Sequence, residues 1–135
     1  MTLVIREPWA TDDVVVLAVP AAGAYLGVLR TATAGLAARL QFTLDEIEDL
    51  RIAVDEACAM LLPIAVPDAE LSCQFTVSDD ALTVETSVPT ASTGPRLPAE
   101  SSFAWKVLTA LTTSASATVT RERATIMLLT RRAMH

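Results

Sequence analysis

Residues 43–62, TLDEIEDLRIAVDEACAMLL, carry the clearest local signals in this chain. Their apolar members recur at the i, i+3/i+4 spacing of one buried helical stripe: Ile47, Leu50, Val54, Ala57 and Leu61. Thr43 and Glu46 match a capping box, in which each side chain bonds the other residue's backbone N–H. Pro63 cannot continue the helical hydrogen-bond ladder. We therefore expect one helix over residues 43–62.

This helix carries two adjacent carboxylates, Asp55 and Glu56, with Met60 one turn after Glu56. The neighbours of Glu56 are apolar, so its carboxylate is expected at the border of the core. A general base is often found in such a place, because partial burial adjusts its proton affinity. A solvated carboxylate with no chemical role fits the same pattern.

Composition limits the possible functions. The chain has 135 residues, 52% of them hydrophobic, which suits one domain over residues 1–135 with a substantial core. The net charge is −6, so the chain is a poor candidate for nucleic-acid binding and a better one for a basic protein partner. No apolar run reaches the roughly 18 residues of a membrane span, and residues 1–13 are too acidic for a signal peptide. We expect a cytoplasmic protein without a membrane partner.

Histidine and cysteine usage excludes several kinds of site. The single histidine is the last residue, His135, so catalysis by Ser-His-Asp or Cys-His groups and zinc sites built on imidazole are not expected. Cys58 and Cys73 have no C-x-x-C spacing and are expected to be buried free thiols. No metal site is predicted.

The remaining elements follow from periodicity and turn residues. Helices are expected over residues 22–40, 43–62 and in a short segment after Ser101 or Ser102, with a proline-containing loop over residues 89–100. Strands are expected over residues 13–19, 70–77, 82–88, 117–121 and 125–131. This order predicts an α/β fold of the α+β two-layer type, with a mostly antiparallel sheet and all helices on one face.

The helix expected over residues 22–40 has two distinct faces. Its core stripe is predicted to be Tyr25, Leu29, Leu36 and Leu40. The opposite face is small and uncharged where a solvated helix usually carries charge, and Arg30 borders it: Gly27, Thr31, Ala34 and Ala38. An arginine on a flat apolar patch is typical of protein interfaces, so these residues are predicted to bind a partner. A plain alanine-rich surface is the alternative.

Three motifs carry a family resemblance: IEDLRIAVDEACAMLL, PDAEL and SFAWKVLTAL. Together they resemble the RsbW type of anti-sigma factor, within the histidine-kinase-like (GHKL, Bergerat-fold) ATPases. They are most similar to the actinobacterial branch that controls sigma-F-type factors. The resemblance runs from about residue 13 to residue 132.

The resemblance implies a Bergerat-type sandwich that holds an RNA polymerase sigma factor inactive and releases it to a STAS-type anti-sigma-factor antagonist. It also implies a homodimer, and it places Arg30 at a first-helix arginine that contacts sigma. Active members use ATP and magnesium to phosphorylate a serine of the antagonist. Their helix motif E-A-x-x-N supplies a base, matched here by Glu56, and a magnesium ligand.

The positions that hold nucleotide in the family have changed in this chain. The magnesium-binding Asn is replaced by Met60, whose thioether is a poor ligand for magnesium. The D-x-G-x-G box falls on Thr86, Val88 and Thr90, and the later G-x-G falls on Ser102 and Ala104. Side chains here occupy space that glycine leaves open for phosphate. No nucleotide or metal cofactor is therefore expected, and Glu56 is interpreted as a vestigial base.

The sequence favours an anti-sigma factor that acts by binding. Two alternatives stay open: an active serine kinase that uses ATP and magnesium, and a sensor of another small ligand in the former nucleotide pocket. The loop over residues 89–100 takes the place of the family's ATP lid, where it is read as a lid or a plain connector, with Arg96 as its one basic residue. Trp9 and Trp105 are expected in core or hinge packing.

Overall fold

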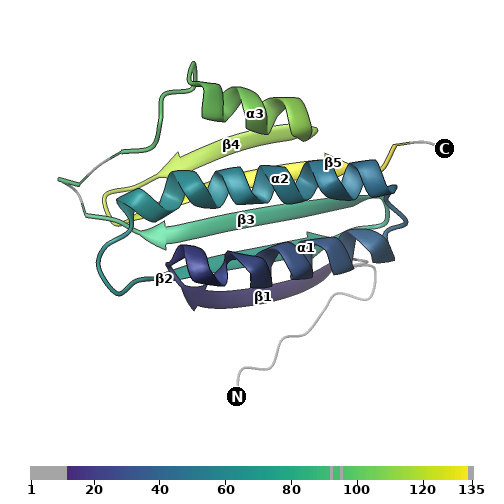
Figure 1. The fold of residues 1–135 in the computed structure, drawn as a ribbon, viewed down its shortest axis with the longest axis horizontal. Helices are drawn as coiled ribbons and strands as arrows, with labels where there is room; N and C mark the ends of the chain where they lie inside the picture. The colour runs from purple at the N-terminus through teal and green to yellow at the C-terminus, as the bar shows by residue number, and fades with distance from the viewer. Residues whose placement is uncertain (1–11, 92, 95, 134–135) are drawn as a thin grey trace.

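The structure, a computed structural model, describes residues 12–91, 93–94 and 96–133. Within these residues, five antiparallel strands form one sheet in the order β1-β2-β3-β5-β4. The strands are β1 (Asp13–Pro20), β2 (Glu70–Val77), β3 (Ala81–Pro89), β4 (Ser114–Val119) and β5 (Arg123–Arg131). The helices α1 (Leu26–Arg39), α2 (Leu44–Leu61) and α3 (Phe103–Leu111) cover one face of the sheet, with α2 in the middle (Figure 1). The predicted two-layer α+β fold is confirmed.

Alternation along β2 and β3 places the core between the sheet and the helices. Leu71, Cys73 and Phe75 are buried, whereas the residues between them are more exposed. Phe75 pairs with Val84, and Cys73 pairs with Thr86, so buried residues of the two strands lie opposite each other. The sheet therefore offers α2 a continuous apolar surface.

The predicted capping box starts α2. The backbone N–H of Glu46 donates to Thr43 Oγ1 over 3.1 Å, and the backbone N–H of Thr43 donates to Glu46 Oε1 over 2.7 Å. The helix ends at Leu61, and a 3-10 turn over Leu62–Ile64 contains Pro63. The apolar stripe of α2 lies in the core, with Leu50, Val54, Ala57 and Leu61 fully buried and Ile47 partly buried against them. The α2 prediction is confirmed.

The prediction that Tyr25 belongs to the core stripe of α1 is wrong. Tyr25 is 44% exposed, because a 3-10 turn over Gly23–Tyr25 precedes α1 and breaks the α-helical periodicity. Leu29 and Leu40 are buried as predicted, and Leu36 is partly buried. Two small residues absent from the predicted stripe, Thr33 and Ala37, are fully buried.

The prediction of a strand over residues 117–121 is also wrong in its bounds. β4 starts at Ser114, because its backbone pairs with β5 as far as Leu129, and it ends before a turn at Thr120. The predicted packing role of Trp105 is confirmed by its burial, whereas Trp9 lies outside the described residues. Within the described part of the chain, the helices are too short or too polar to span a membrane.

Candidate functional site

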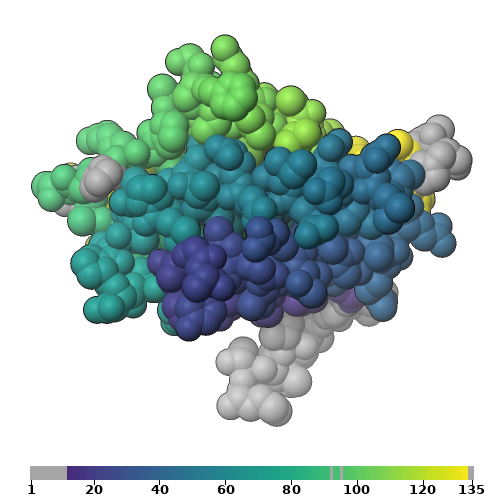
Figure 2. Space-filling view, in the orientation of Figure 1, coloured from purple at the N-terminus to yellow at the C-terminus, as the bar shows by residue number. Residues whose placement is uncertain are grey.

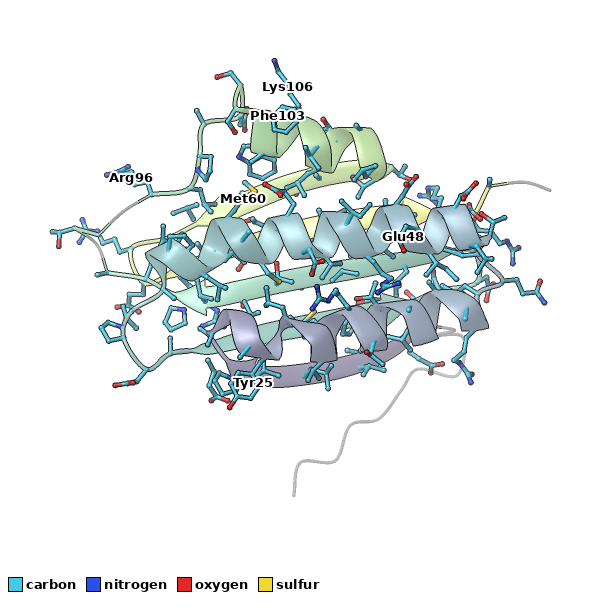
Figure 3. The ribbon with its side chains drawn as sticks, in the orientation of Figure 1. Tyr25, Glu48, Met60, Arg96, Phe103 and Lys106 are labelled. Atoms are coloured by element: carbon cyan, nitrogen blue, oxygen red, sulfur yellow. The ribbon has the colours of Figure 1, made fainter. Side chains whose placement is uncertain are left out.

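Glu56 and Met60 lie one turn apart on α2, on the side that faces α3. Figure 3 shows Met60 between these two helices. The Glu56 side chain is half-buried, and no partner for it is found among the described residues. Met60 is only 5% exposed and belongs to the core cluster. The predicted base therefore lies beside a buried thioether, which cannot replace the oxygen ligand that magnesium requires.

Thr86 and Val88, two positions of the family's D-x-G-x-G box, lie in β3 with their side chains in the core. Val88 and Thr86 are fully buried, and the Thr86 hydroxyl donates to the Ile126 carbonyl oxygen across the sheet over 3.5 Å. Thr90 follows the strand, and its backbone N–H donates to the Glu122 carbonyl oxygen over 2.8 Å. The groups that a nucleotide would have to contact here are apolar or already hydrogen-bonded within the protein.

Ser102 caps the start of α3. The hydroxyl of Ser102 accepts a long hydrogen bond of 3.5 Å from the Trp105 backbone N–H, which helps to satisfy the open N–H groups of the first turn. Ala104 packs against the core. Phe103 between them is 80% exposed and projects away from the molecule, as does Lys106 (Figure 3). The position of the second glycine box is thus a capped helix start with an exposed aromatic ring.

Trp105 holds the end of the loop over residues 89–100 against α3. Its indole Nε1 donates to the Pro98 carbonyl oxygen over 2.9 Å, and the ring is buried. Leu97, one residue earlier, packs against the core. The end of the loop therefore lies against the first turn of α3, which contains Ala104.

A cavity of about 610 Å³ lies at the end of the sheet, beside these positions. Its lining comes from the turn after α2, the residues after β3 and the β4–β5 turn: Ile64, Thr90, Ala91, Gly94, Arg96, Leu97, Val119, Thr120 and Arg121. Of the positions that hold nucleotide in the family, Thr90 is the one that lines this cavity. Arg96 lies on the loop (Figure 3), and Arg121 in the β4–β5 turn was not singled out by the sequence.

The predicted partner-binding residues lie together on α1. Thr31 and Ala38 are exposed, whereas Gly27, Arg30 and Ala34 are partly buried, and Arg30 reaches toward α2. We call these five residues the α1 face. In the space-filling view, α1 and α2 lie side by side across one side of the molecule (Figure 2).

Arg30 is tied to α2 by an ion pair that the sequence did not predict. Its Nη1 donates to Asp55 Oδ2 over 3.3 Å, with side chains 42% and 37% exposed. A Cβ at Gly27 would lie 3.6 Å from Arg30 Nη2, so the guanidinium lies directly above this glycine. The short-range signals in the sequence gave no indication of the pair, because its members are 25 positions apart.

The two cysteines, Cys58 on α2 and Cys73 on β2, are buried free thiols, as predicted. Burial raises the pKa of the Cys58 thiol to about 12, and the charge of Asp55 adds to the effect. Burial likewise raises the pKa of Cys73 to about 12, with a smaller contribution from Cys58. Among the described residues, no group of His, Cys, Asp or Glu is arranged to hold a metal ion. These thiols are therefore structural and weakly reactive.

Comparison with known proteins gives a consistent set of relatives. Over 75 residues the chain is 41% identical to the serine-protein kinase RsbW of Bacillus subtilis (strain 168), covering 53% of this chain and 47% of that protein. Over 86 residues it is 38% identical to the anti-sigma-F factor RsbW of Mycobacterium tuberculosis (strain H37Rv), covering 64% and 50%. No family model matches the chain.

The chain thus spans about half the length of the curated relatives it matches. The matched stretches are shorter than the predicted range of residues 13–132. The relatives nevertheless have the names that the sequence motifs predicted, and the fold is the expected two-layer sandwich. By sequence, this chain is similar to the RsbW-type anti-sigma factors, and its fold is of the type that this similarity implies.

Proposed function

We propose that this chain is an anti-sigma factor that binds an alternative sigma factor of the sigma-F type and withholds it from RNA polymerase. The observation that carries the proposal is the α1 face, where Arg30 borders small uncharged side chains. Small residues let a partner backbone approach closely, and arginine is a frequent anchor in such interfaces. The name of the Mycobacterium tuberculosis relative, anti-sigma-F factor, supports a sigma factor as the partner.

The proposed mechanism is occlusion without phosphoryl transfer. Phosphoryl transfer depends on placing a metal and positive charge around the phosphates. Met60 and Val88 are buried apolar groups at two nucleotide positions, and Ser102 caps α3 at a third. This arrangement supports a chain that needs no nucleotide or magnesium, with Glu56 retained as a vestige.

The proposal extends to partners and location. A STAS-type antagonist would release the sigma factor by competing for an overlapping part of the α1 face. Two copies of the chain would form a homodimer that presents both α1 faces. The site of action is the cytoplasm, where RNA polymerase works, and the net charge of −6 favours a protein over a nucleic acid as the direct partner.

A reconstituted transcription assay tests the function. Core RNA polymerase and a sigma-F-type factor from the same genome are mixed with the wild-type chain, which should block initiation at the cognate promoter. Arg30→Glu should relieve the block, because it reverses the one charge of the α1 face. Arg39→Glu is the matched control. Arg39 is exposed about two and a half turns further along α1, on the opposite side.

The result of this assay has two clear readings. A block that is relieved by Arg30→Glu and kept by Arg39→Glu supports the function. A wild-type chain that leaves initiation unaffected, or two variants that behave alike, contradicts it.

A serine kinase is the second candidate, because the Bacillus subtilis relative is named a serine-protein kinase. Transfer of labelled phosphate from ATP to a candidate antagonist, lost in Glu56→Ala, would establish this activity. A ligand sensor is the third candidate, supported by the cavity that Arg96 and Arg121 line. Its ligand would be an anion, and loss of binding in Arg121→Ala would identify the site.

A further inference from the structure

The ion pair between Arg30 and Asp55 joins the α1 face to the middle of α2. Within the described residues, Arg30 is the one hydrogen-bonding partner of the Asp55 carboxylate. The nearby Arg51 uses its Nη1 for Glu48 Oε2 over 3.2 Å instead. Asp55 therefore acts on one cation, and that cation lies at the border of the predicted interface.

The geometry leaves Arg30 able to bind a second acid. The pair is a single contact through Nη1 and Oδ2, and no other hydrogen bond of the guanidinium is present among the described residues. A guanidinium carries further N–H donors along its other edges. Since the side chain is 42% exposed, those donors are within reach of a carboxylate from a docking protein.

The glycine next to the guanidinium leaves room for it. The guanidinium lies over Gly27, where a Cβ would come within 3.6 Å of Nη2. Asp55 on α2 thus contacts the guanidinium, while Gly27 on α1 leaves the space beside Nη2 open. The ion pair thereby favours one orientation of a long, flexible side chain before any partner arrives.

An exposed pair of this kind contributes little to folding, because water screens it and both side chains lose freedom. Its effect on binding is different. A partner that meets an already oriented arginine does not have to restrict that side chain on docking, which favours affinity. The pair is therefore expected to affect complex formation more than stability.

We propose that Asp55 is the functional member of the two adjacent carboxylates Asp55 and Glu56. It acts as a positioning residue that orients Arg30 toward a carboxylate of the sigma factor. This inference rests on the proposed function. The opposite role for Asp55 would be a competitor that occupies Arg30 and must be displaced. The two roles predict changes of opposite sign when the charge of Asp55 is removed.

Calorimetric titration with a purified sigma-F-type factor from the same genome tests the inference. Asp55→Asn keeps the shape of the side chain and should weaken affinity about three- to tenfold. Asp55→Glu should recover most of that loss, since it restores the charge. In an Arg30→Ala background, Asp55→Asn should cause no further loss, because its effect passes through Arg30.

Two controls separate positioning from a general effect. Asp49→Asn removes the same charge from an exposed place on α2 and should bind like the wild type. Urea unfolding of Asp55→Asn should give a midpoint close to that of the wild type. If Asp55→Asn fails to fold, Asp55→Ser provides a second uncharged variant for the same comparison.

The outcomes distinguish the inference from the function beneath it. Wild-type binding with unchanged or tighter binding by Asp55→Asn overturns the positioning role and leaves the anti-sigma function standing. An equal loss in the Arg30→Ala background overturns it as well. A wild-type chain that binds no sigma factor overturns the function, and the inference with it.

Discussion

Arg30 on α1 and Asp55 on α2 are joined by an ion pair of 3.3 Å between Nη1 and Oδ2. The adjacent carboxylates that mark the central helix therefore lie in different surroundings. Asp55 contacts the α1 face, whereas Glu56 lies one turn from the buried Met60, on the side of α3. The structure thus places Asp55 beside the predicted partner-binding face and Glu56 near positions that are predicted to have lost nucleotide binding.

Replacing Met60 should not restore a nucleotide site. Met60→Asn supplies the missing amide ligand, but the buried Val88 and Thr86 and the capped start of α3 remain. The new amide would also be buried without a designed partner, which costs about 1–3 kcal/mol of stability. Calorimetry with ATP and magnesium should show no binding by Met60→Asn or the wild type. Micromolar binding by either protein would show that the site still functions.

The hydrogen bond from Trp105 to the Pro98 carbonyl oxygen should restrain the loop over residues 89–100. Trp105→Phe removes the 2.9 Å hydrogen bond and should cost about 1 kcal/mol. The loop should then be cut faster by trypsin after Arg96, as followed by mass spectrometry of the fragments. Cleavage after Lys106, inside α3, serves as the internal control. Equal rates after Arg96 in both proteins would mean that the indole does not restrain the loop.

The capping box should stabilise α2 measurably. Thr43→Ala removes the acceptor of the Glu46 backbone N–H and should lower the free energy of unfolding by about 1 kcal/mol. Thr31→Ala removes an exposed helical threonine that has no side-chain hydrogen bond among the described residues, and should change it by less than about 0.5 kcal/mol. Urea unfolding of the two variants measures the difference. Similar values for both would argue against a stabilising cap.

The buried thiols should make stability fall at high pH. Each cysteine has its pKa raised from 9.0 to about 12 in the folded chain, so the folded state holds its thiol protons longer than the unfolded state. Their contribution is fully present below pH 9, and it is lost as pH rises through the window up to about 12. Urea unfolding at a series of pH values checks the sign.

A thiol reagent gives a direct control for the same prediction. At pH 8 it should modify Cys58 and Cys73 slowly in the folded chain and rapidly in urea, because both thiols are buried. Rapid modification of the folded chain would show that these side chains are accessible.

Local patterns in the sequence predicted most of the fold. The capping box at Thr43, the alternation along β2 and the turn before β3 each determine a short segment through neighbouring residues. The errors arise where distant parts of the chain decide. Tyr25 lies outside the core because it belongs to a 3-10 turn. β4 begins at Ser114, earlier than predicted, because its backbone pairs with β5 as far as Leu129.

The candidate site was predicted in part. The five residues of the α1 face come together because they share one side of a helix, which periodicity predicts. The link to Asp55 depends on how two helices pack, and periodicity within one helix does not determine that packing. The cavity at Arg121 likewise brings together three segments that are far apart in the sequence.

The central claim is that this chain binds a sigma factor without nucleotide. The most direct measurement is calorimetric titration of the wild-type chain with a sigma-F-type factor from the same genome, with and without ATP and magnesium. The account predicts a saturable complex of the same affinity in both conditions, lost in Arg30→Glu and kept in Arg39→Glu. Absence of binding, or binding that requires ATP, would contradict it.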